Sequence, residues 1–281
     1  MHMYLSMTVK GLLIATGLSA NAPVAQTADA GRPPTAVTFA SGLDRPWGMA
    51  FLPDGQILVT ERGGQLRRVS ADGQQVSAPI AGLPAVRSGG QGGLLDVAVD
   101  PDFSTAPWVY WSYSEAGDGG GGTAVARGRL AGNALTDVQV ILRQLPKVSG
   151  GNHWGSRLVW GADKTLFVTL GDRMVDSPSR PNGAGAHHPG NLLGKVARIQ
   201  RDGIVPADNP FVGKAGARPE IYSLGHRNPQ GAARHPASGE LWVVEHGPQG
   251  GDEVNRVKPG ANYGWPLRSY GCPYGSTVGE A

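Results

Sequence analysis

Four copies of one sequence pattern dominate this chain of 281 residues. Each copy consists of an apolar run, a short turn rich in Pro, Asp and Gly, and a second apolar run. The copies span residues 47–61, 95–113, 157–169 and 230–244, at irregular intervals. Short apolar runs bounded by turn-forming residues are typical of β-strands. Each copy therefore predicts an antiparallel hairpin, and the chain as a whole predicts an all-β fold.

Repeated antiparallel units of this size indicate a β-propeller, in which sheets surround an axis and each sheet buries its faces against its neighbours. A site at the axis would then draw single residues from distant parts of the sequence. Most propellers need more than four blades, and residues 271–275 resemble a turn rather than a strand. We therefore expect a partial propeller that lacks one or two C-terminal blades. A four-bladed ring and a twisted open sheet are the alternatives.

Composition supports a globular β protein and excludes several other classes. The 40% hydrophobic content is enough for a sizeable core, and the 44 Gly and 22 Pro follow no Gly-X-Y period, which excludes collagen. The net charge is +3, but the basic residues are scattered, so no nucleic-acid-binding surface is indicated. The single cysteine, Cys272, excludes an internal disulfide and a cysteine zinc cluster. No apolar run after the N-terminal segment is long enough to span a bilayer.

The N-terminus has the pattern of a secretory signal. Lys10 precedes an apolar run at residues 11–18, and small residues follow at 20–22. We therefore predict a signal peptide and the start of a linker at residues 1–30, and a periplasmic or secreted protein. A buried strand or a disordered tail is the alternative for this segment. The partial propeller domain is predicted to occupy residues 31–281.

Two polar loops bracket the strand-like run at residues 240–245. The first loop, residues 225–231, carries Arg227 and Asn228. Arg227 offers a planar, permanently charged donor fork that suits a carboxylate or a quinone oxygen, and Asn228 adds a donor and an acceptor. Rigid strands with polar loops at their ends commonly carry sites, so this loop is a candidate ligand contact.

The second loop follows the same strand and suits a hard cation. Gly247 tolerates unusual backbone angles, Pro248 has no N–H, and the carbonyl groups of such a loop can face an ion. Asp252 and Glu253 add negative charge, and ligation by oxygen atoms alone suits Ca²⁺. Turns of Gly, Pro and Asp are common, so an ordinary turn with surface charges is the alternative.

Two glycine-rich segments precede the second and third hairpins. Residues 89–93 place four glycines around Gln91, and no Lys-Ser/Thr pair follows, so this is not a phosphate-binding loop. Residues 150–157 carry His153, whose imidazole could act as a general base. A flexible turn and a structural histidine are the alternatives. The histidine spacings match no zinc motif, and the sequence has no Gly-X-Ser-X-Gly elbow.

Five short motifs together resemble those of the soluble PQQ-dependent sugar dehydrogenases, and in particular their aldose sugar dehydrogenase branch. The motifs are Asn-His-X-Gly-Ser-Arg-Leu at residues 152–158, Leu-Gly-Asp at 170–172, Gly-His-Arg-Asn-Pro-Gln-Gly at 225–231, Glu-His-Gly-Pro-X-Gly-Gly-Asp-Glu at 245–253 and Asn-Tyr-Gly-Trp-Pro at 262–266. Each motif alone is weak, but the series is specific. The resemblance covers residues 36–275 and implies a six-bladed β-propeller.

The resemblance also implies roles for single residues. His153 would take the proton from the anomeric hydroxyl of a sugar, and Arg227 would contact the quinone oxygen. Asn152 stands where some members of the family have Asp. The full set is His153 and Arg227 for catalysis; Gln91, Asn152, Arg227 and Asn228 for the cofactor; Gly247 and Pro248 for the calcium ion that holds PQQ; and Glu253 and Tyr263 for a second calcium ion.

These roles imply oxidation of an aldose to its lactone, dependent on PQQ and Ca²⁺, with hydride transfer to the quinone and an external electron acceptor. The Lys and Arg residues that complete the PQQ grip in the family would lie beyond residue 281, so we expect this chain to bind PQQ weakly or not at all. Two other functions remain open. One is a non-catalytic propeller that binds a protein or glycan through its loops, and the other is a metal-dependent lactone hydrolase.

Overall fold

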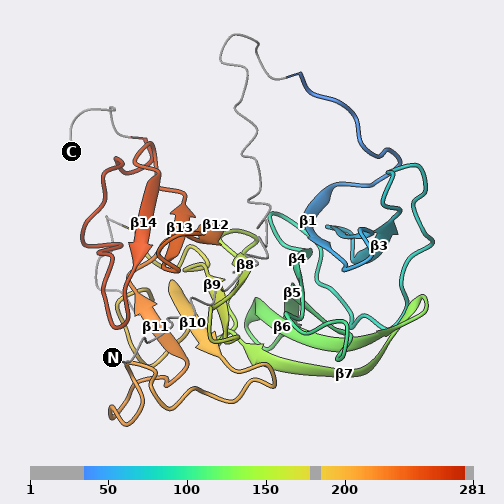
Figure 1. Cartoon of the computed structure of the whole chain (residues 1–281). Helices are drawn as coiled ribbons and strands as arrows, with labels where there is room; N and C mark the ends of the chain where they lie inside the picture. Colours follow the sequence, from blue (N-terminus) through green and yellow to red (C-terminus); the bar gives the residue numbers. More distant parts are fainter. Residues whose placement is uncertain (1–34, 178–184, 276–281) are drawn as a thin grey trace, which may run out of the picture. The chain divides into compact units, whose positions relative to one another are not determined.

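Antiparallel β-sheet makes up the regular structure of this protein. The computed structural model describes residues 35–177 and 185–275 (Figure 1). The chain divides into two units, residues 1–37 and 38–281, and the fold described below is that of the second unit. The predicted signal at residues 1–30 lies outside the described residues. In the described part of the chain, no helix has the length and apolar character needed to cross a membrane.

The strands of the described residues form four sheets, and within each sheet neighbouring strands are consecutive in the chain. The first sheet contains β1 (Pro46–Phe51), β2 (Ile57–Glu61) and β3 (Gln65–Val69). The second contains β4 (Leu94–Val99), β5 (Trp108–Gly117), β6 (Gly120–Ala131) and β7 (Ala134–Arg143). The third contains β8 (Gly155–Trp160), β9 (Leu166–Leu170), β10 (Lys195–Ile199) and β11 (Ile221–Leu224). The fourth contains β12 (Pro229–Arg234), β13 (Leu241–Glu245) and β14 (Glu253–Val257).

The four predicted hairpins are confirmed, and each forms the first two strands of one sheet. In the first sheet, Met49 pairs with Val59 across the predicted turn. In the fourth sheet, Ala232 pairs with Val243. Along β13, the side chains alternate between buried and exposed positions, as expected for a pleated strand with one face in the core. The repeated sequence pattern therefore marks the inner half of every sheet.

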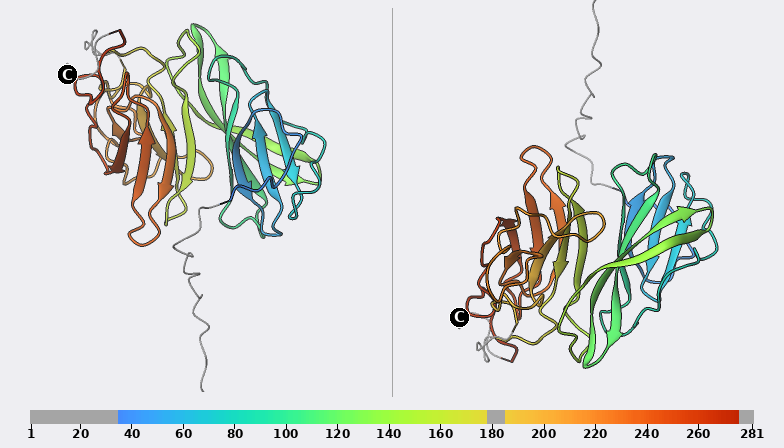
Figure 2. Two further views of the ribbon diagram at one scale, coloured as in Figure 1. Left: turned by 90° about the horizontal axis from the view of Figure 1, so that it is seen from above. Right: turned by 90° about the horizontal axis from the view of Figure 1, so that it is seen from below.

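The first strands of successive sheets lie next to one another. β1 packs against β4, β4 against β8, and β8 against β12. Figure 2 shows the four sheets following one another in chain order, as the colours indicate. β1 and β4 approach closely because residue 48 is glycine, where a Cβ would lie 2.7 Å from Asp96 Oδ1. The predicted propeller-type fold is confirmed, and the described residues form four of the six blades that the resemblance implies.

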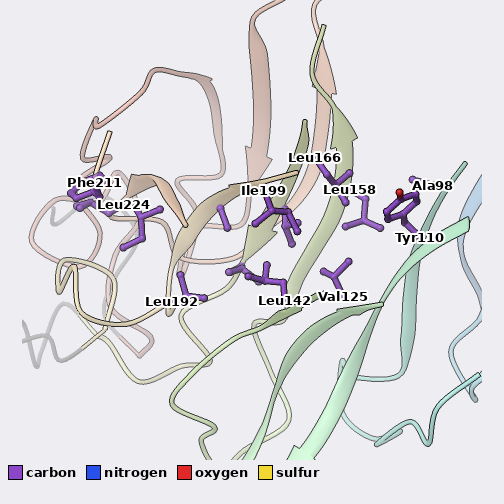
Figure 3. Packing of buried hydrophobic residues seen from close by; sticks show 14 residues of the cluster. Ala98, Tyr110, Val125, Leu142, Leu158, Leu166, Leu192, Ile199, Phe211 and Leu224 are labelled. Carbon is purple, nitrogen blue, oxygen red and sulfur yellow. The ribbon is translucent and has the colours of Figure 1, made fainter. Parts of the chain in front are cut away.

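Apolar side chains between neighbouring sheets form the core. One cluster joins the second and third sheets, where Tyr110 and Val125 meet Leu166 and Ile199 (Figure 3). A second cluster joins the first and second sheets around Trp111, and a third cluster joins the last two sheets. Each sheet thus buries a face that it could not bury alone.

The two outermost sheets each keep an apolar face that is partly open. Met49 and Phe51 on β1 are both 63% exposed, and an apolar hollow of about 340 Å³ lies on this face of the first sheet. On the fourth sheet, Val244 pairs with Val254, and both side chains are exposed. No hydrophobic cluster of the described residues joins the fourth sheet to the first. Neither a closed four-bladed ring nor one open sheet is observed.

Candidate active site

A cavity of about 220 Å³ lies among loops of the third and fourth sheets. His153 reaches it from the loop before β8, Arg227 from the loop between β11 and β12, and Pro248 from the loop between β13 and β14. Trp265 and Tyr274, from the segment after β14, complete one wall. The structure therefore brings together three predicted site residues that are distant in the sequence.

His153 forms a hydrogen-bonded pair with Asp172. His153 Nδ1 lies 2.6 Å from Asp172 Oδ1, and the two side chains are almost completely buried. Asp172 also accepts hydrogen bonds from Trp265 Nε1 at 2.7 Å and from Met174 N at 2.8 Å. Because a carboxylate only accepts, it holds the imidazole with its proton on Nδ1. Nε2, which has no hydrogen-bond partner among the described residues, is then free to accept a proton in the cavity.

Glycines allow the two loops of this pair to approach each other. Gly171 precedes Asp172, and a Cβ at this position would lie 2.1 Å from the carbonyl oxygen of His153. Gly155 has a φ of 62°, which favours glycine, and a Cβ there would lie 2.7 Å from Gly171 N. The pairing of Gly155 with Leu170 across β8 and β9 sets the distance between the loops. The local sequence thus determines the His153–Asp172 contact.

Arg227 is buried beside the cavity, and its guanidinium group has no carboxylate partner in the described part of the chain. Nη1 donates to the carbonyl oxygens of His246 at 3.0 Å and Gly247 at 2.5 Å, and Nη2 donates to the Tyr274 hydroxyl at 3.1 Å. Nε is buried and unpaired among the described residues. The guanidinium carbon also lies 5.2 Å from the ring centre of Trp265. A permanent positive charge without a counter-ion is therefore available to an electron-rich ligand.

Glu245 holds the backbone of Arg227 in place by a hydrogen bond. Its carboxylate accepts from Arg227 N at 2.8 Å, contacts His226 Nδ1 at 2.9 Å and accepts from Asn255 Nδ2 at 2.8 Å. Burial alone would raise the pKa of Glu245, but the charge of His226 and these hydrogen bonds outweigh it and hold the pKa below its ordinary value. Glu245 therefore remains ionised and anchors the loop that carries Arg227.

The predicted cofactor contacts Gln91, Asn152 and Asn228 all lie close to the His153 loop. Gln91 Oε1 accepts from His153 N at 2.8 Å. Asn228 Oδ1 accepts from Gly155 N at 3.2 Å, and Asn152 Nδ2 donates to the sulfur of Met174 at 3.1 Å. In this structure, all three side chains help to position the loop, and their contact with a cofactor remains a prediction.

The predicted calcium ligands fall into two places. Pro248 lines the cavity, and the carbonyl oxygen of Gly247 faces Arg227 Nη1. Glu253 and Tyr263 line a different cavity of about 420 Å³. Within residues 35–177 and 185–275, no three His, Cys, Asp or Glu side chains form a group that could hold a metal ion. Calcium binding would therefore depend on carbonyl oxygens, and it remains a prediction.

Several residues of the site were not among those predicted. Asp172 belongs to the Leu-Gly-Asp motif after β9, but its pairing with His153 could only be seen once β8 and β9 were in register. Trp265 lies in the Asn-Tyr-Gly-Trp-Pro motif, but the motif gave no indication of its contact with Asp172. Tyr274 and Asp176 carried no sequence signal, because both come from irregular segments.

Comparison with known proteins gives one consistent family. A family model described as glucose/sorbosone dehydrogenase matches residues 43–281. The aldose sugar dehydrogenase YliI of Escherichia coli is 48% identical over 244 residues, which is 85% of this chain and 64% of that protein. The quinoprotein glucose dehydrogenase B of Acinetobacter calcoaceticus is 34% identical over 252 residues, which is 80% of this chain and 51% of that protein. The chain thus spans less than two thirds of the length of these relatives.

Solved structures agree with these sequence relatives. The soluble aldose sugar dehydrogenase of Escherichia coli in its apo form has a TM-score of 0.78 at 47% identity, over 84% of this chain and 67% of that one. The PQQ-bound aldose sugar dehydrogenase of Streptomyces coelicolor has a TM-score of 0.71 at 33% identity, over 83% of this chain and 66% of that one.

Proposed function

This chain belongs to the glucose and sorbosone dehydrogenase family, and on that premise we propose that the protein oxidises aldose sugars at the anomeric carbon to lactones. PQQ is the cofactor, Ca²⁺ anchors it, and an external acceptor removes the electrons. His153 is the general base and Arg227 is the cation beside the quinone. The names of the relatives, which include a quinoprotein and a PQQ-bound enzyme, support this choice of chemistry.

One observation carries the proposal: His153, which is hydrogen-bonded to Asp172, and Arg227 line the same cavity. Oxidation of a sugar hydroxyl requires a group that removes the hydroxyl proton. It also requires a positive charge where the acceptor becomes negative. His153 Nε2 supplies the first and Arg227 supplies the second, and the two groups come from separate loops that face the same space.

His153 receives the proton of the anomeric hydroxyl at Nε2. Its Nδ1–H remains donated to Asp172, whose negative charge stabilises the imidazolium that forms. Trp265 holds the second oxygen of Asp172, so the carboxylate cannot turn away from the imidazole. A base positioned in this way typically accelerates a reaction by about 10²–10⁴-fold.

The side chains around the cavity suit a flat, anionic quinone. Arg227 has one unpaired donor and no carboxylate partner among the described residues, and the rings of Trp265 and Tyr274 lie beside its guanidinium group. When bound, PQQ supplies the quinone that accepts the hydride of the substrate. Arg227, Gln91, Asn152 and Asn228 would hold it.

Carbonyl oxygens of Gly247 and Pro248 would bind the calcium ion. In this structure, Gly247 O accepts a hydrogen bond from Arg227 Nη1. Glu253 and Tyr263 would bind a second calcium ion in the neighbouring cavity, where burial raises the pKa of Glu253 and an ion would lower it again.

Reconstitution tests this function. The purified chain with saturating PQQ and Ca²⁺ should reduce a redox dye when glucose is added, and removal of Ca²⁺ should abolish the reaction. In His153→Ala, the turnover rate should fall about 10²–10⁴-fold, because the hydroxyl proton loses its acceptor. PQQ should still bind to the variant, and quenching of tryptophan fluorescence measures this binding.

His235→Ala is the matched control, since His235 is exposed in the turn between β12 and β13. It should retain the activity of the unmodified protein. If His153→Ala also retained it, His153 would not be the base. If the unmodified chain bound PQQ and Ca²⁺ but showed no aldose-dependent dye reduction, the non-catalytic alternative would stand instead.

A further inference from the structure

Asp176 places a carboxyl group in the cavity, and the reaction described above does not use it. It lines the cavity together with His153 and Arg227 and is only 5% exposed. Oδ2 accepts a hydrogen bond from Ala186 N. Oδ1 has no hydrogen-bond partner among the described residues, and this atom is not completely shielded from solvent. One oxygen of a buried carboxyl group is therefore open to a molecule in the cavity.

The segment that contacts Asp176 is firmly held. Lys195 is completely buried, and its Nζ donates to the carbonyl oxygens of Gly185 at 3.0 Å and Ala186 at 2.9 Å. Residue 185 is glycine, where a Cβ would lie 2.1 Å from Asp176 Oδ2. The carboxyl group thus packs against a backbone segment that the buried Lys195 holds by hydrogen bonds, which gives Asp176 a defined orientation.

Asp172, which pairs with His153, and Asp176, which lines the cavity, have different hydrogen-bond partners. Asp172 accepts three hydrogen bonds, whereas Asp176 accepts one. Burial raises the pKa of Asp176, and the charge of Asp172 adds to this, against the Ala186 hydrogen bond, Lys195 and His187. The Oδ1 atom of Asp176 can accept a hydrogen bond from a hydroxyl group whether the carboxyl group is ionised or protonated.

We propose that Asp176 binds a hydroxyl group of the substrate other than the one that is oxidised, and that it makes the site selective for sugars that carry this hydroxyl. The inference rests on the proposed aldose oxidation and adds the residue that recognises the sugar. A buried polar group that is left unpaired is costly, so an aldose lacking the contacted hydroxyl should be a poorer substrate.

Singly deoxygenated glucoses test the inference. The unmodified protein, loaded with PQQ and Ca²⁺, should discriminate against one of 2-deoxy-, 3-deoxy-, 4-deoxy- and 6-deoxyglucose relative to glucose by about 10–100-fold in kcat/KM. Asp176→Ala should lose most of that discrimination, mainly through a higher KM for glucose. Asp176→Asn keeps an oxygen for Ala186 N but offers only a donor to the sugar, so its discrimination should be intermediate.

Asp118→Asn is the control, because it makes the same chemical change in an exposed turn between β5 and β6. It should match the unmodified protein for every sugar. If Asp176→Ala fails to fold by circular dichroism, Asp176→Asn decides the question. If the Asp176 variant has the same kcat/KM ratio of glucose to each deoxy sugar as the unmodified protein, the role of Asp176 is overturned while the proposed function stands. Absence of glucose oxidation in the unmodified protein overturns the proposed function, and the present inference with it.

Discussion

Asp172 determines the chemical state of the candidate base. It accepts hydrogen bonds from His153, Trp265 and Met174 N, so three different parts of the chain fix its position. An ionised aspartate can only accept hydrogen bonds, and this forces the imidazole proton onto Nδ1. The proton-accepting nitrogen then faces the cavity without any further adjustment.

Asp172→Asn should separate geometry from chemistry at this position. The Asn amide is nearly isosteric, but it can donate to Nδ1 and so favour the imidazole form with its proton on Nε2. We expect kcat to fall about 10²–10⁴-fold while the fold remains intact. Steady-state dye reduction measures kcat, and circular dichroism monitors the fold. Asp54→Asn, in the exposed turn between β1 and β2, should leave kcat unchanged. A fully active Asp172→Asn protein would show that this carboxylate does not govern the base.

Single residues differ in how far the sequence could predict them. His153 and Arg227 sit in specific motifs, and the structure places both at one cavity as predicted. Asp172 was quoted as part of a motif but was given no role, since its distance to His153 depends on strand register. Asp176 carries no motif at all, and its place in the cavity depends on the buried Lys195 and the segment it holds.

At the scale of elements, β13 links its two neighbours through one buried carboxylate. Glu245 ends this strand, and it lies opposite Pro229 on β12 and Glu253 on β14. Its side chain bonds to His226, Arg227 N and Asn255, so it joins the loop before β12 to the strand on the other side. Loss of the negative charge should loosen both contacts.

Glu245→Gln should lower the free energy of unfolding by about 1–3 kcal/mol at neutral pH, because buried donors lose a charged acceptor. The pKa of Glu245 is held below its ordinary value of 4.5. Between the lowered pKa of Glu245 in the folded protein and its ordinary value in the unfolded chain, the unfolded chain binds more protons than the folded one. The stabilisation from ionised Glu245 is therefore present above pH 4.5, and it is lost as the pH falls through the pKa of Glu245 in the folded protein. Thermal unfolding from pH 3 to pH 7 in both proteins measures the difference.

Glu240, whose side chain is 41% exposed, provides the control, and Glu240→Gln should unfold like the unmodified protein at each pH. Asp96 and Asp176, whose pKa values are raised mainly by burial, have the opposite pH dependence but are present in all three proteins, so they cancel in the comparison. The pKa of Glu253 is raised partly by the charge of Glu245, so Glu253 contributes to the difference. A constant stability gap across the whole pH range would contradict the role assigned to the ionised Glu245.

The inner strands could be predicted and the outer ones could not, for a physical reason. β1, β2, β8, β9 and β13 carry apolar runs between turn residues, which reflects burial between neighbouring sheets. β3 has the sequence Gln-Leu-Arg-Arg-Val, and β6 begins with three glycines, so neither shows a clear alternation. These strands form because an inner strand already offers a row of hydrogen-bonding groups, an effect that arises from the sheet and not from the local sequence.

For the molecule as a whole, the open faces of the first and last sheets are the dominant feature. The three interior sheet contacts bury their apolar side chains, whereas Phe51 on β1 and Val254 on β14 remain 63% and 65% exposed. Contiguous apolar surface of this kind favours association between molecules. The sequence indicated a partial propeller, but not which side chains its outer sheets would leave exposed.

We therefore expect the chain to self-associate as its concentration rises, and the double variant Phe51→Lys with Val254→Lys to do so less. Charges at these exposed positions disrupt the apolar surface without entering the core. Sedimentation velocity from low to high concentration measures the association, and binding of an apolar fluorescent dye measures the open surface; both should decrease. Val138→Lys, on the exposed side of β7, adds the same charge elsewhere and should have little effect. If the double variant associated as strongly as the unmodified chain, these two faces would not be the contact between molecules. A contact through them would bury the two lysine side chains, and burying these charges would weaken the association.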